Sequence, residues 1–300
     1  MKHLLIAAAT AGLIALGACE STGYGAAKAY DPAMISPSAE AELESVLAAQ
    51  PEATKARYDA RHPGETLAFI GVEPGMTVVE ALPGGGWYTR ILMPYLGPEG
   101  EVIGAIYPDD IWARILPPDM QNDLDAFIAR QARWAEGTAD WGIEDGAAVS
   151  QYKMTSAPDA LDGTVDAVLF IRALHNLHRV EEDLGHFSAT IAEAHDLLRP
   201  GGVVGVVQHR AGEDTPDAWA RGDAGYLKQS DVVAAFEAAG FELEASSEIN
   251  ANPADMAGPG DIVWRLPPSL ATTEEGTPER AAMEAIGESD RMTLRFRKPG

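Results

Sequence analysis

Cysteine and basic residues are both scarce in this sequence. Cys19 is the only cysteine among 300 residues, so the chain can form no disulfide within itself. The 22 lysines and arginines are outnumbered by 46 aspartates and glutamates, which gives a formal net charge of −24. Nucleic-acid binding needs clustered basic side chains, whereas these are scattered, so we expect no nucleic-acid partner. The 46% hydrophobic content is that of a globular protein, and the acidity favours solubility.

The apolar run near the N-terminus is too short to span a membrane. It extends from Leu4 to Leu16 and stops at Gly17, whereas a spanning helix needs about 20 apolar residues. Lys2 and His3 precede it, and a short cationic region followed by such a run is typical of a secretory signal peptide. The sequence therefore predicts an exported protein.

The residues that follow this run are similar to the lipobox of bacterial lipoproteins. That resemblance rests on Leu16-Gly17-Ala18-Cys19 and implies cleavage after residue 18 and acylation of Cys19. Two or three acyl chains on one residue would give stable membrane attachment. The alternative is a plain signal peptide cleaved near Ala18, with Cys19 incidental. We predict a lipid anchor at Cys19 in the bacterial cell envelope, with a soluble periplasmic domain.

The rest of the chain divides into a tether and one domain. Residues 19–36 are rich in Ser, Thr, Gly, Ala and Pro, which is typical of a linker. The domain should cover 37–300 and open with helices, because Ser36-Pro37-Ser38 is a helix-start pattern and Pro51 ends the run. A second short helix is expected over 52–61.

From residue 73 onward, apolar strands alternate with amphipathic helices, which indicates an α/β domain with a parallel sheet. Two apolar stripes at helical spacing, over 120–134 and 184–198, should belong to the core. Ser230 is expected to cap a helix that ends at Gly240. The stretch 247–290 should be a long loop with a short helix over 278–286. The expected strands are 77–81, 101–106, 149–153, 165–171, 203–208, 241–246 and 292–297.

A glycine turn follows the first strand. It reads Glu80-Ala81-Leu82-Pro83-Gly84-Gly85-Gly86-Trp87-Tyr88-Thr89. Three consecutive glycines let a ligand approach the backbone closely, and a helix starting near Trp87 would point free N–H groups at the same place. The turn therefore predicts a binding site.

This segment resembles the first motif of class I S-adenosylmethionine-dependent methyltransferases. The resemblance implies that Glu80 and Gly84–Gly86 hold the methionine part of the cofactor S-adenosylmethionine. A closer resemblance, over about residues 57–300, is to a family of predicted methyltransferases from bacterial envelopes. The matching pieces are Arg61-His62-Pro63, Leu67-Ala68-Phe69, the glycine turn, Arg172-Ala173-Leu174-His175-Asn176, Gln208-His209-Arg210, Asn252-Pro253 and Leu294-Arg295-Phe296-Arg297-Lys298-Pro299.

The family implies a fold and a place for the site. We expect a three-layer Rossmann-like methyltransferase fold with a mostly parallel seven-stranded sheet, whose last strand lies antiparallel beside the fifth. The ligand crevice should lie at the carboxyl ends of the first, second and fourth strands.

The sequence departs from the family at the cofactor site. Leu82 stands where glycine is usual, and Ile106 stands where an acidic residue commonly binds the ribose. Asp109 or Asp110 could reach the ribose instead, or could simply start a helix. Tyr107 follows the second strand, and the aromatic ring of Tyr88 either stacks on the cofactor or packs the helix on the sheet. The predicted cofactor-binding residues are Glu80, Gly84, Gly85, Gly86, Tyr88, Tyr107 and Asp109.

Candidate catalytic residues follow the fourth and fifth strands. His175, Asn176 and His209 would face the acceptor, and a histidine would act as a base only if the acceptor carries a proton. The alternative is that these histidines cap a helix or fill a polar gap. Arg172 and Arg210 are the predicted substrate-binding residues, although Arg172 could merely pair with a surface acid.

Two other kinds of chemistry are not expected. His175 and His178 are three residues apart, but no third ligand at familiar spacing and no His-Glu-x-x-His pattern accompanies them, so we predict no metal site. A Gly-x-Ser-x-Gly nucleophile pattern is missing as well, which argues against a hydrolase.

The leading hypothesis is methyl transfer from S-adenosylmethionine to a small or envelope-associated acceptor, and protein partners are left open. The competing hypothesis is an inactive methyltransferase-like fold that acts as a ligand-binding or envelope-interaction lipoprotein. The residue Ile106 and the cytoplasmic origin of the cofactor favour the second. A carboxylate of Asp109 or Asp110 aimed into the crevice beside Gly84 would favour the first hypothesis. A crevice filled by Trp87, Tyr107 or the late loop would favour the second.

Overall fold

The computed structural model describes residues 34–116 and 121–300. The predicted signal peptide, Cys19 and most of the predicted tether lie outside these residues. In the described part of the chain, no helix combines the length and the apolar character needed to cross a membrane.

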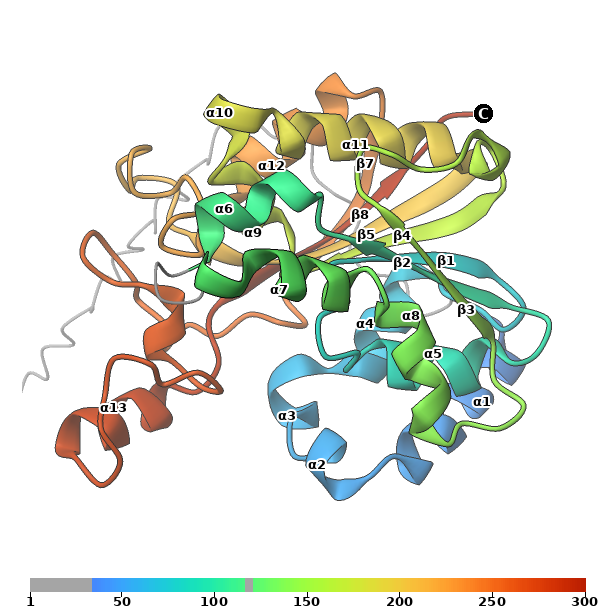
Figure 1. Ribbon diagram of the computed structural model, residues 1–300. Helices are drawn as coiled ribbons and strands as arrows, with labels where there is room; N and C mark the ends of the chain where they lie inside the picture. The colour runs from blue at the N-terminus through green and yellow to red at the C-terminus, as the bar shows by residue number, and fades with distance from the viewer. Residues whose placement is uncertain (1–33, 117–120) are drawn as a thin grey trace, which may run out of the picture.

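One mixed sheet organises the described residues, and it confirms the predicted fold class (Figure 1). All seven predicted strands form, and the short β6 is an eighth that pairs with the end of β5. The order is β3-β2-β1-β4-β5-β8-β7, and β8 runs antiparallel to both β5 and β7, as the family resemblance implied for the last strand. The strands are β1 (Thr77–Ala81), β2 (Glu101–Ile106), β3 (Ala148–Lys153), β4 (Val165–Ile171), β5 (Leu198–Ala211), β6 (Leu227–Lys228), β7 (Glu242–Ser247) and β8 (Arg291–Arg297).

Helices cover both faces of the sheet (Figure 1), and the inner strands β1, β2, β4, β5 and β8 are mostly buried, whereas the edge strands β3 and β7 are only partly buried. On one face lie α1 (Pro37–Ala49), α4 (Pro63–Ile70) and α5 (Thr89–Leu96). The other face carries α9 (Leu174–His178), α10 (Glu181–Leu184), α11 (His186–Leu197) and α12 (Gln229–Ala238). The remaining helices are α2 (Glu52–Lys55), α3 (Tyr58–Arg61), α6 (Trp112–Ile115), α7 (Leu124–Gln131), α8 (Trp134–Gly137) and α13 (Pro278–Ile286).

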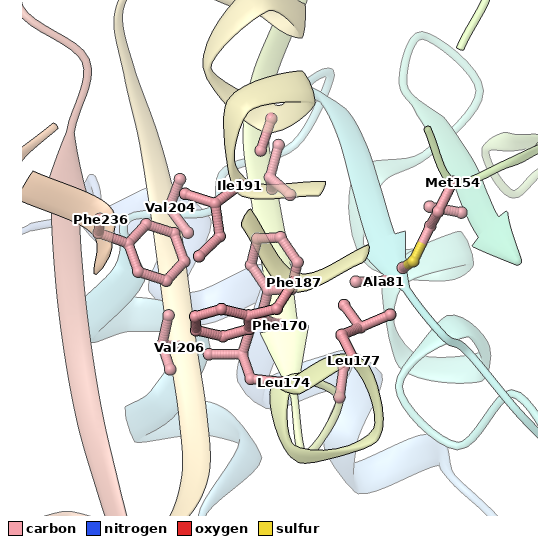
Figure 2. Packing of buried hydrophobic residues seen from close by; sticks show 14 of the residues in the cluster. Ala81, Met154, Phe170, Leu174, Leu177, Phe187, Ile191, Val204, Val206 and Phe236 are labelled. Atoms are coloured by element: carbon pink, nitrogen blue, oxygen red, sulfur yellow. The ribbon is translucent and has the colours of Figure 1, made fainter. Parts of the chain in front are cut away.

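The larger apolar core lies between the sheet and α9, α11 and α12. Figure 2 shows Phe170 of β4 against Phe236 of α12, and their ring centroids are 5.7 Å apart. Phe187 and Ile191 of α11 come from the predicted helical stripe over 184–198, and both are buried. This packing positions the carboxyl end of β4 and the start of α9, which carries two of the predicted catalytic residues, His175 and Asn176.

Three local expectations need correction. The helix expected over 52–61 is two short helices, α2 and α3, broken at residues 56 and 57. Ser230 does not cap α12, because Lys228 holds the N-cap position and the Glu213 carboxylate accepts from both the amide and the hydroxyl of Ser230. Trp134 was expected in the apolar helical stripe over 120–134, but its ring packs over Gly104 of β2 instead.

Candidate active site

A cavity of about 560 Å³ lies at the carboxyl ends of β1, β4 and β5. This is within the roughly 300–1,000 Å³ of small-molecule sites. Its walls come from the glycine turn after β1, the segment after β4, the end of β5 and two pieces of the late loop. The lining residues are Ala53, Thr54, Glu80, Leu82–Gly85, Trp87, Tyr88, Arg90, Ile171, Arg172, His175, Asn176, His209, Val263, Trp264, Leu266–Ser269, Glu288 and Ser289.

The three glycines of the turn have different surroundings. A Cβ at Gly85 would meet no atom within 4 Å, and both Gly84 and Gly85 line the cavity. Gly86 is covered, because a Cβ there would lie 2.1 Å from the ring of Trp141. Gly84 and Gly85 are therefore open to a ligand, whereas Gly86 is a packing glycine, contrary to the prediction that it binds the cofactor.

Leu82 explains how the turn forms without the usual glycine. Its φ is +52°, a left-handed conformation that glycine adopts freely and other residues reach at a cost of about 1–2 kcal/mol. The turn thus keeps the expected shape with a strained leucine. Helix α5 begins at Thr89, two residues later than the predicted start at Trp87.

Glu80 is buried at the bottom of the turn, where its exposed fraction is 4%. Oγ1 of Thr89 donates a hydrogen bond of 2.6 Å to Oε2 of Glu80. Burial raises the pKa of Glu80 to about 8, and the bond from Thr89 opposes part of that shift. In the ligand-free protein this carboxyl is therefore largely protonated at neutral pH. A cation beside it would favour ionisation.

The residues after β2 do not reach the cavity. Asp109 accepts from Lys153 at 2.6 Å, and Asp110 lies 2.8 Å from Nε2 of His186. The ring of Tyr107 meets Trp112 edge-on, with centroids 4.3 Å apart. Asp109 and Tyr107 are therefore corrected as cofactor-binding residues, because each already has a partner outside the cavity.

Two tryptophans occupy the space beside β2. A Cβ on Gly104 would lie 2.3 Å from the ring of Trp134, and Nε1 of Trp134 donates to the carbonyl oxygen of Gly84 at 3.0 Å. The ring of Trp141 covers Gly86, and the guanidinium of Arg90 stacks on that ring, 3.7 Å from its centroid. The cavity therefore opens from the turn toward β4 and β5 rather than toward β2.

His175 and His209, the two histidines predicted to face the acceptor, both line the cavity, with ring centroids 5.2 Å apart. The side-chain amide of Gln208 is oriented by donation to the Gly225 carbonyl at 3.0 Å, so its Oε1 faces Nδ1 of His175 at 3.3 Å. Nδ1 of His175 thus donates, which leaves Nε2 with its lone pair. Burial lowers the pKa of His175 to about 4 and also lowers that of His209, so both rings are neutral at pH 7.

The other predicted residues divide into two groups. Asn176 and Tyr88 line the cavity, as does Ser289, whose Oγ lies 2.5 Å from Nδ1 of His209. Arg210 does not line it, because its guanidinium donates to both Glu248 and Asp290 on the far side of β5. Arg210 is therefore corrected from a substrate-binding residue to a structural one.

Several site residues had no signal in the sequence. Glu288 and Ser289 come from the end of the late loop, and Trp264 comes from its middle. Arg61 was noted only as part of a matching motif, yet its Nε donates to both oxygens of Glu288 at 3.0 and 3.1 Å. Among the described residues, no group of three or more His, Cys, Asp or Glu side chains could hold a metal ion.

The residues present fit one end of S-adenosylmethionine. The open backbone at Gly84 and Gly85 and the buried carboxyl of Glu80 suit the methionine part, which carries an ammonium and a carboxylate. For the ribose hydroxyls, the residues after β2 provide no carboxylate that lines the cavity.

No protein-family model and no curated protein sequence matches the chain. Similar solved structures include the [4+2]-cyclase SpnF, with 16% identity over 80% of this chain and 81% of that one and a TM-score of 0.50. A methyltransferase from Aquifex aeolicus, described as dependent on S-adenosylmethionine, has 14% identity over 86% and 98% of the two chains and a TM-score of 0.48. A geranyl diphosphate C-methyltransferase from Streptomyces coelicolor has 15% identity over 85% and 87%, with a TM-score of 0.49.

The strand order, together with the likeness to SpnF, shows the fold, which matches the Rossmann-like methyltransferase fold. They do not define the reaction, because a cyclase is among the proteins that share the fold. The argument for function therefore rests on the cavity and its residues.

Proposed function

We propose that this protein transfers a methyl group from S-adenosylmethionine to a small or envelope-associated acceptor. The observation that carries the proposal is the single cavity that joins the open glycine turn and Glu80 to His175 and His209. The neighbouring structures support this reaction at the level of the fold. The cofactor would supply an activated methyl group on a positively charged sulfur.

Glu80, Gly84 and Gly85 would hold the methionine end of the cofactor. The backbone N–H groups of the turn would donate hydrogen bonds to the carboxylate of the cofactor. Glu80 would ionise beside the ammonium and keep its bond from Thr89. At the other end of the cavity, Nε2 of His175 can accept a proton from an acceptor that carries one, because Gln208 holds the opposite ring nitrogen as the donor. Asn176 and His209 lie beside this acceptor region.

The test is calorimetric titration of S-adenosylmethionine and S-adenosylhomocysteine into the purified protein, its Glu80→Gln variant and its Asp109→Asn variant. We expect micromolar binding that weakens about tenfold, or about 1.4 kcal/mol, in Glu80→Gln because a charge-assisted contact is lost. Asp109→Asn is the matched control and should bind as the wild type does. A folded wild-type protein that binds neither compound would overturn the proposal.

We also propose that the chain is exported and anchored through acylated Cys19. The support is the sequence of residues 1–19, and the experiment is fractionation of a bacterial host that expresses the full chain. Mass spectrometry should find acyl groups on an N-terminal Cys19, and Cys19→Ser should move the protein out of the membrane fraction. Recovery of unacylated wild-type protein in the soluble fraction would contradict the anchor. Because S-adenosylmethionine is made in the cytoplasm, the compartment also decides where activity should be sought.

A further inference from the structure

Four arginines converge on one carboxylate beside the cavity, in a chain whose net charge is −24. Glu288 lies 3.0 Å from Arg61, 3.2 Å from Arg57 and 3.2 Å from Arg291. Arg172 is 3.7 Å away. Glu288 and Arg61 are both buried, so water screens these charges weakly. Among the described residues of this cluster, positive charge therefore exceeds negative charge.

Arg172 is the member of the cluster whose charge is least compensated. Its Nε is buried and has no hydrogen-bond partner within the described residues, and its distance to Glu288 is longer than a hydrogen bond. Burial and the neighbouring Arg61 lower the pKa of Arg172 to about 10. Arg210, by contrast, forms hydrogen bonds with two carboxylates. The free donors of Arg172 thus remain available to a ligand in the cavity that it lines.

The surroundings of Arg172 add a second free donor and little negative charge. Nε1 of Trp87 is also buried without a partner in the described part of the chain, and Trp87 lines the same cavity. Glu80 and Glu288 are the acidic side chains among the described lining residues. Glu80 is mostly neutral in the free protein, and Glu288 is shared with the other three arginines. A negatively charged ligand would therefore be attracted to the wall of the cavity formed by Arg172 and Trp87.

The backbone gives a third observation. Arg172 has a φ of +57°, although it is not a glycine, and it directly follows the end of β4. Strained conformations of this kind concentrate at binding and catalytic sites. Arg172 stands on the same wall as His175 and His209, away from β2.

We propose that the methyl acceptor carries an oxyanion, a carboxylate or a phosphate, that is bound by Arg172. This inference rests on the proposed methyl transfer. The guanidinium fork of Arg172 would bind two oxygens of the ligand, and Nε1 of Trp87 would donate to the same group. The atom to be methylated would then lie on the side of His175.

The test uses inorganic phosphate and acetate as separate probes, at constant ionic strength maintained with chloride. Binding is followed by the thermal unfolding temperature of the full protein and by calorimetry. Arg172→Gln is compared with Arg179→Gln, because the side chains of Arg172 and Arg179 are 25% and 23% exposed and Arg179 does not line the cavity. Arg172→Gly is a second variant, since glycine adopts the backbone conformation at this position without strain.

We expect saturable binding of at least one probe to the wild type and to Arg179→Gln, and a loss of about tenfold or more in both Arg172 variants. The probe with the stronger binding tells whether the acceptor group is a carboxylate or a phosphate. S-adenosylhomocysteine should bind equally well with and without a saturating probe.

Three results would overturn the inference, and they separate it from the proposed function. If S-adenosylhomocysteine binds but neither probe does, the oxyanion site is wrong and methyl transfer stands. If the probe competes with S-adenosylhomocysteine, Arg172 belongs to the carboxylate of the cofactor and not to the acceptor. If the wild type does not bind S-adenosylhomocysteine at all, both proposals fail.

Discussion

Oγ1 of Thr89 lies 2.6 Å from Oε2 of Glu80, and this bond joins the first turn of α5 to the end of β1. The contact offsets only part of the free energy needed to bury the carboxylate, because the pKa of Glu80 is still raised to about 8. Carboxyl groups with a strongly raised pKa are concentrated at functional sites, which agrees with the proposed role of Glu80.

Glu80→Gln should therefore stabilise the ligand-free protein at alkaline pH. The folded-state pKa of about 8 exceeds the ordinary value of 4.5, so the protonated form favours folding. The contribution of Glu80 is fully present below pH 4.5 and is lost as the pH rises through 8, at up to about 1.4 kcal/mol per unit of pKa difference. The amide of glutamine cannot ionise and avoids this loss.

Urea unfolding of wild type and Glu80→Gln at several pH values from 5 to 9 measures the difference. Glu193→Gln is the comparison variant. Burial raises the pKa of Glu193 as well, but its carboxylate accepts hydrogen bonds from the backbone amides of residues 155 and 157, so this substitution should stabilise the protein less than Glu80→Gln does. A stability difference between wild type and Glu80→Gln that does not grow with pH would contradict a raised pKa.

Substitution of alanine should separate the roles of two adjacent glycines. Gly86→Ala combines a φ of +74° with a contact of 2.1 Å to Trp141, so we expect a loss of about 2 kcal/mol or more in the free energy of unfolding. Gly85→Ala meets no atom within 4 Å and should change stability by less than about 1 kcal/mol. Its methyl group would nevertheless project at the open backbone of the turn.

Calorimetry should find that Gly85→Ala weakens S-adenosylhomocysteine binding while its unfolding temperature stays near that of the wild type. Unchanged affinity in Gly85→Ala would mean that the turn does not hold the cofactor. Equal stability of the two variants would mean that Trp141 does not cover Gly86.

The fold was predictable because its strands have a strong local signal. A parallel strand buried on both faces is a short run rich in Val, Ile and Leu, as over 101–106, 165–171 and 203–208, and all seven predicted strands form. Strand β6 has two residues, Leu227 and Lys228, which is too short for any periodicity. The break at residues 56 and 57 coincides with a tertiary contact, in which the guanidinium of Arg57 donates a hydrogen bond to the Glu288 carboxylate.

The site was predictable where it adjoins a strand end and hidden where it depends on distant contacts. The glycine turn and His175 follow β1 and β4 directly. Arg61 and Glu288, however, are 227 residues apart, and nothing local links them. Arg210 was misassigned because successive residues of a strand point to opposite faces, so that His209 faces the cavity and Arg210 faces Asp290. Asp109 was misassigned because Lys153, opposite the end of β2, neutralises it.

His175 should be a single neutral tautomer across the physiological pH range. Its pKa is lowered to about 4 by burial, and Gln208 fixes Nδ1 as the donor. Nitrogen NMR of histidine-labelled protein should show Nδ1 protonated and no titration of His175 between about pH 5 and 8. The folded pKa lies below the ordinary value of 6.5, so stability from this group is present above pH 6.5 and is lost as the pH falls toward 4.

The Gln208→Leu variant checks the cause of that tautomer. Leucine removes the acceptor of the His175 proton and keeps the bulk of the side chain, so the two neutral tautomers should both become populated. His178 is an internal reference, because its Nδ1 contacts the carbonyl of Arg221 and not Gln208. A tautomer of His175 that is unchanged in Gln208→Leu would show that another group orients the ring.

The Arg172→Gly variant should be about as stable as the wild type or more stable. Replacement of a half-buried arginine by glycine would ordinarily be destabilising. Relief of the left-handed conformation at φ +57° contributes about 1–2 kcal/mol, and the greater freedom of glycine in the unfolded chain costs about 0.5–1 kcal/mol. Removal of Arg172 also removes repulsion from Arg61 and Arg291. The attraction of Glu288 over 3.7 Å is lost as well, but the repulsion from Arg61 acts more strongly on Arg172.

Arg61→Ala provides the contrast, because Arg61 is buried and donates to both oxygens of Glu288. Breaking a buried pair of this kind costs about 3–5 kcal/mol, and the remaining arginines should reduce that loss to about 2 kcal/mol or more. Urea unfolding at pH 7 compares the two variants with the wild type. If Arg172→Gly were as unstable as Arg61→Ala, Arg172 would be part of the structural ion cluster, and its strained backbone would need an explanation other than ligand binding.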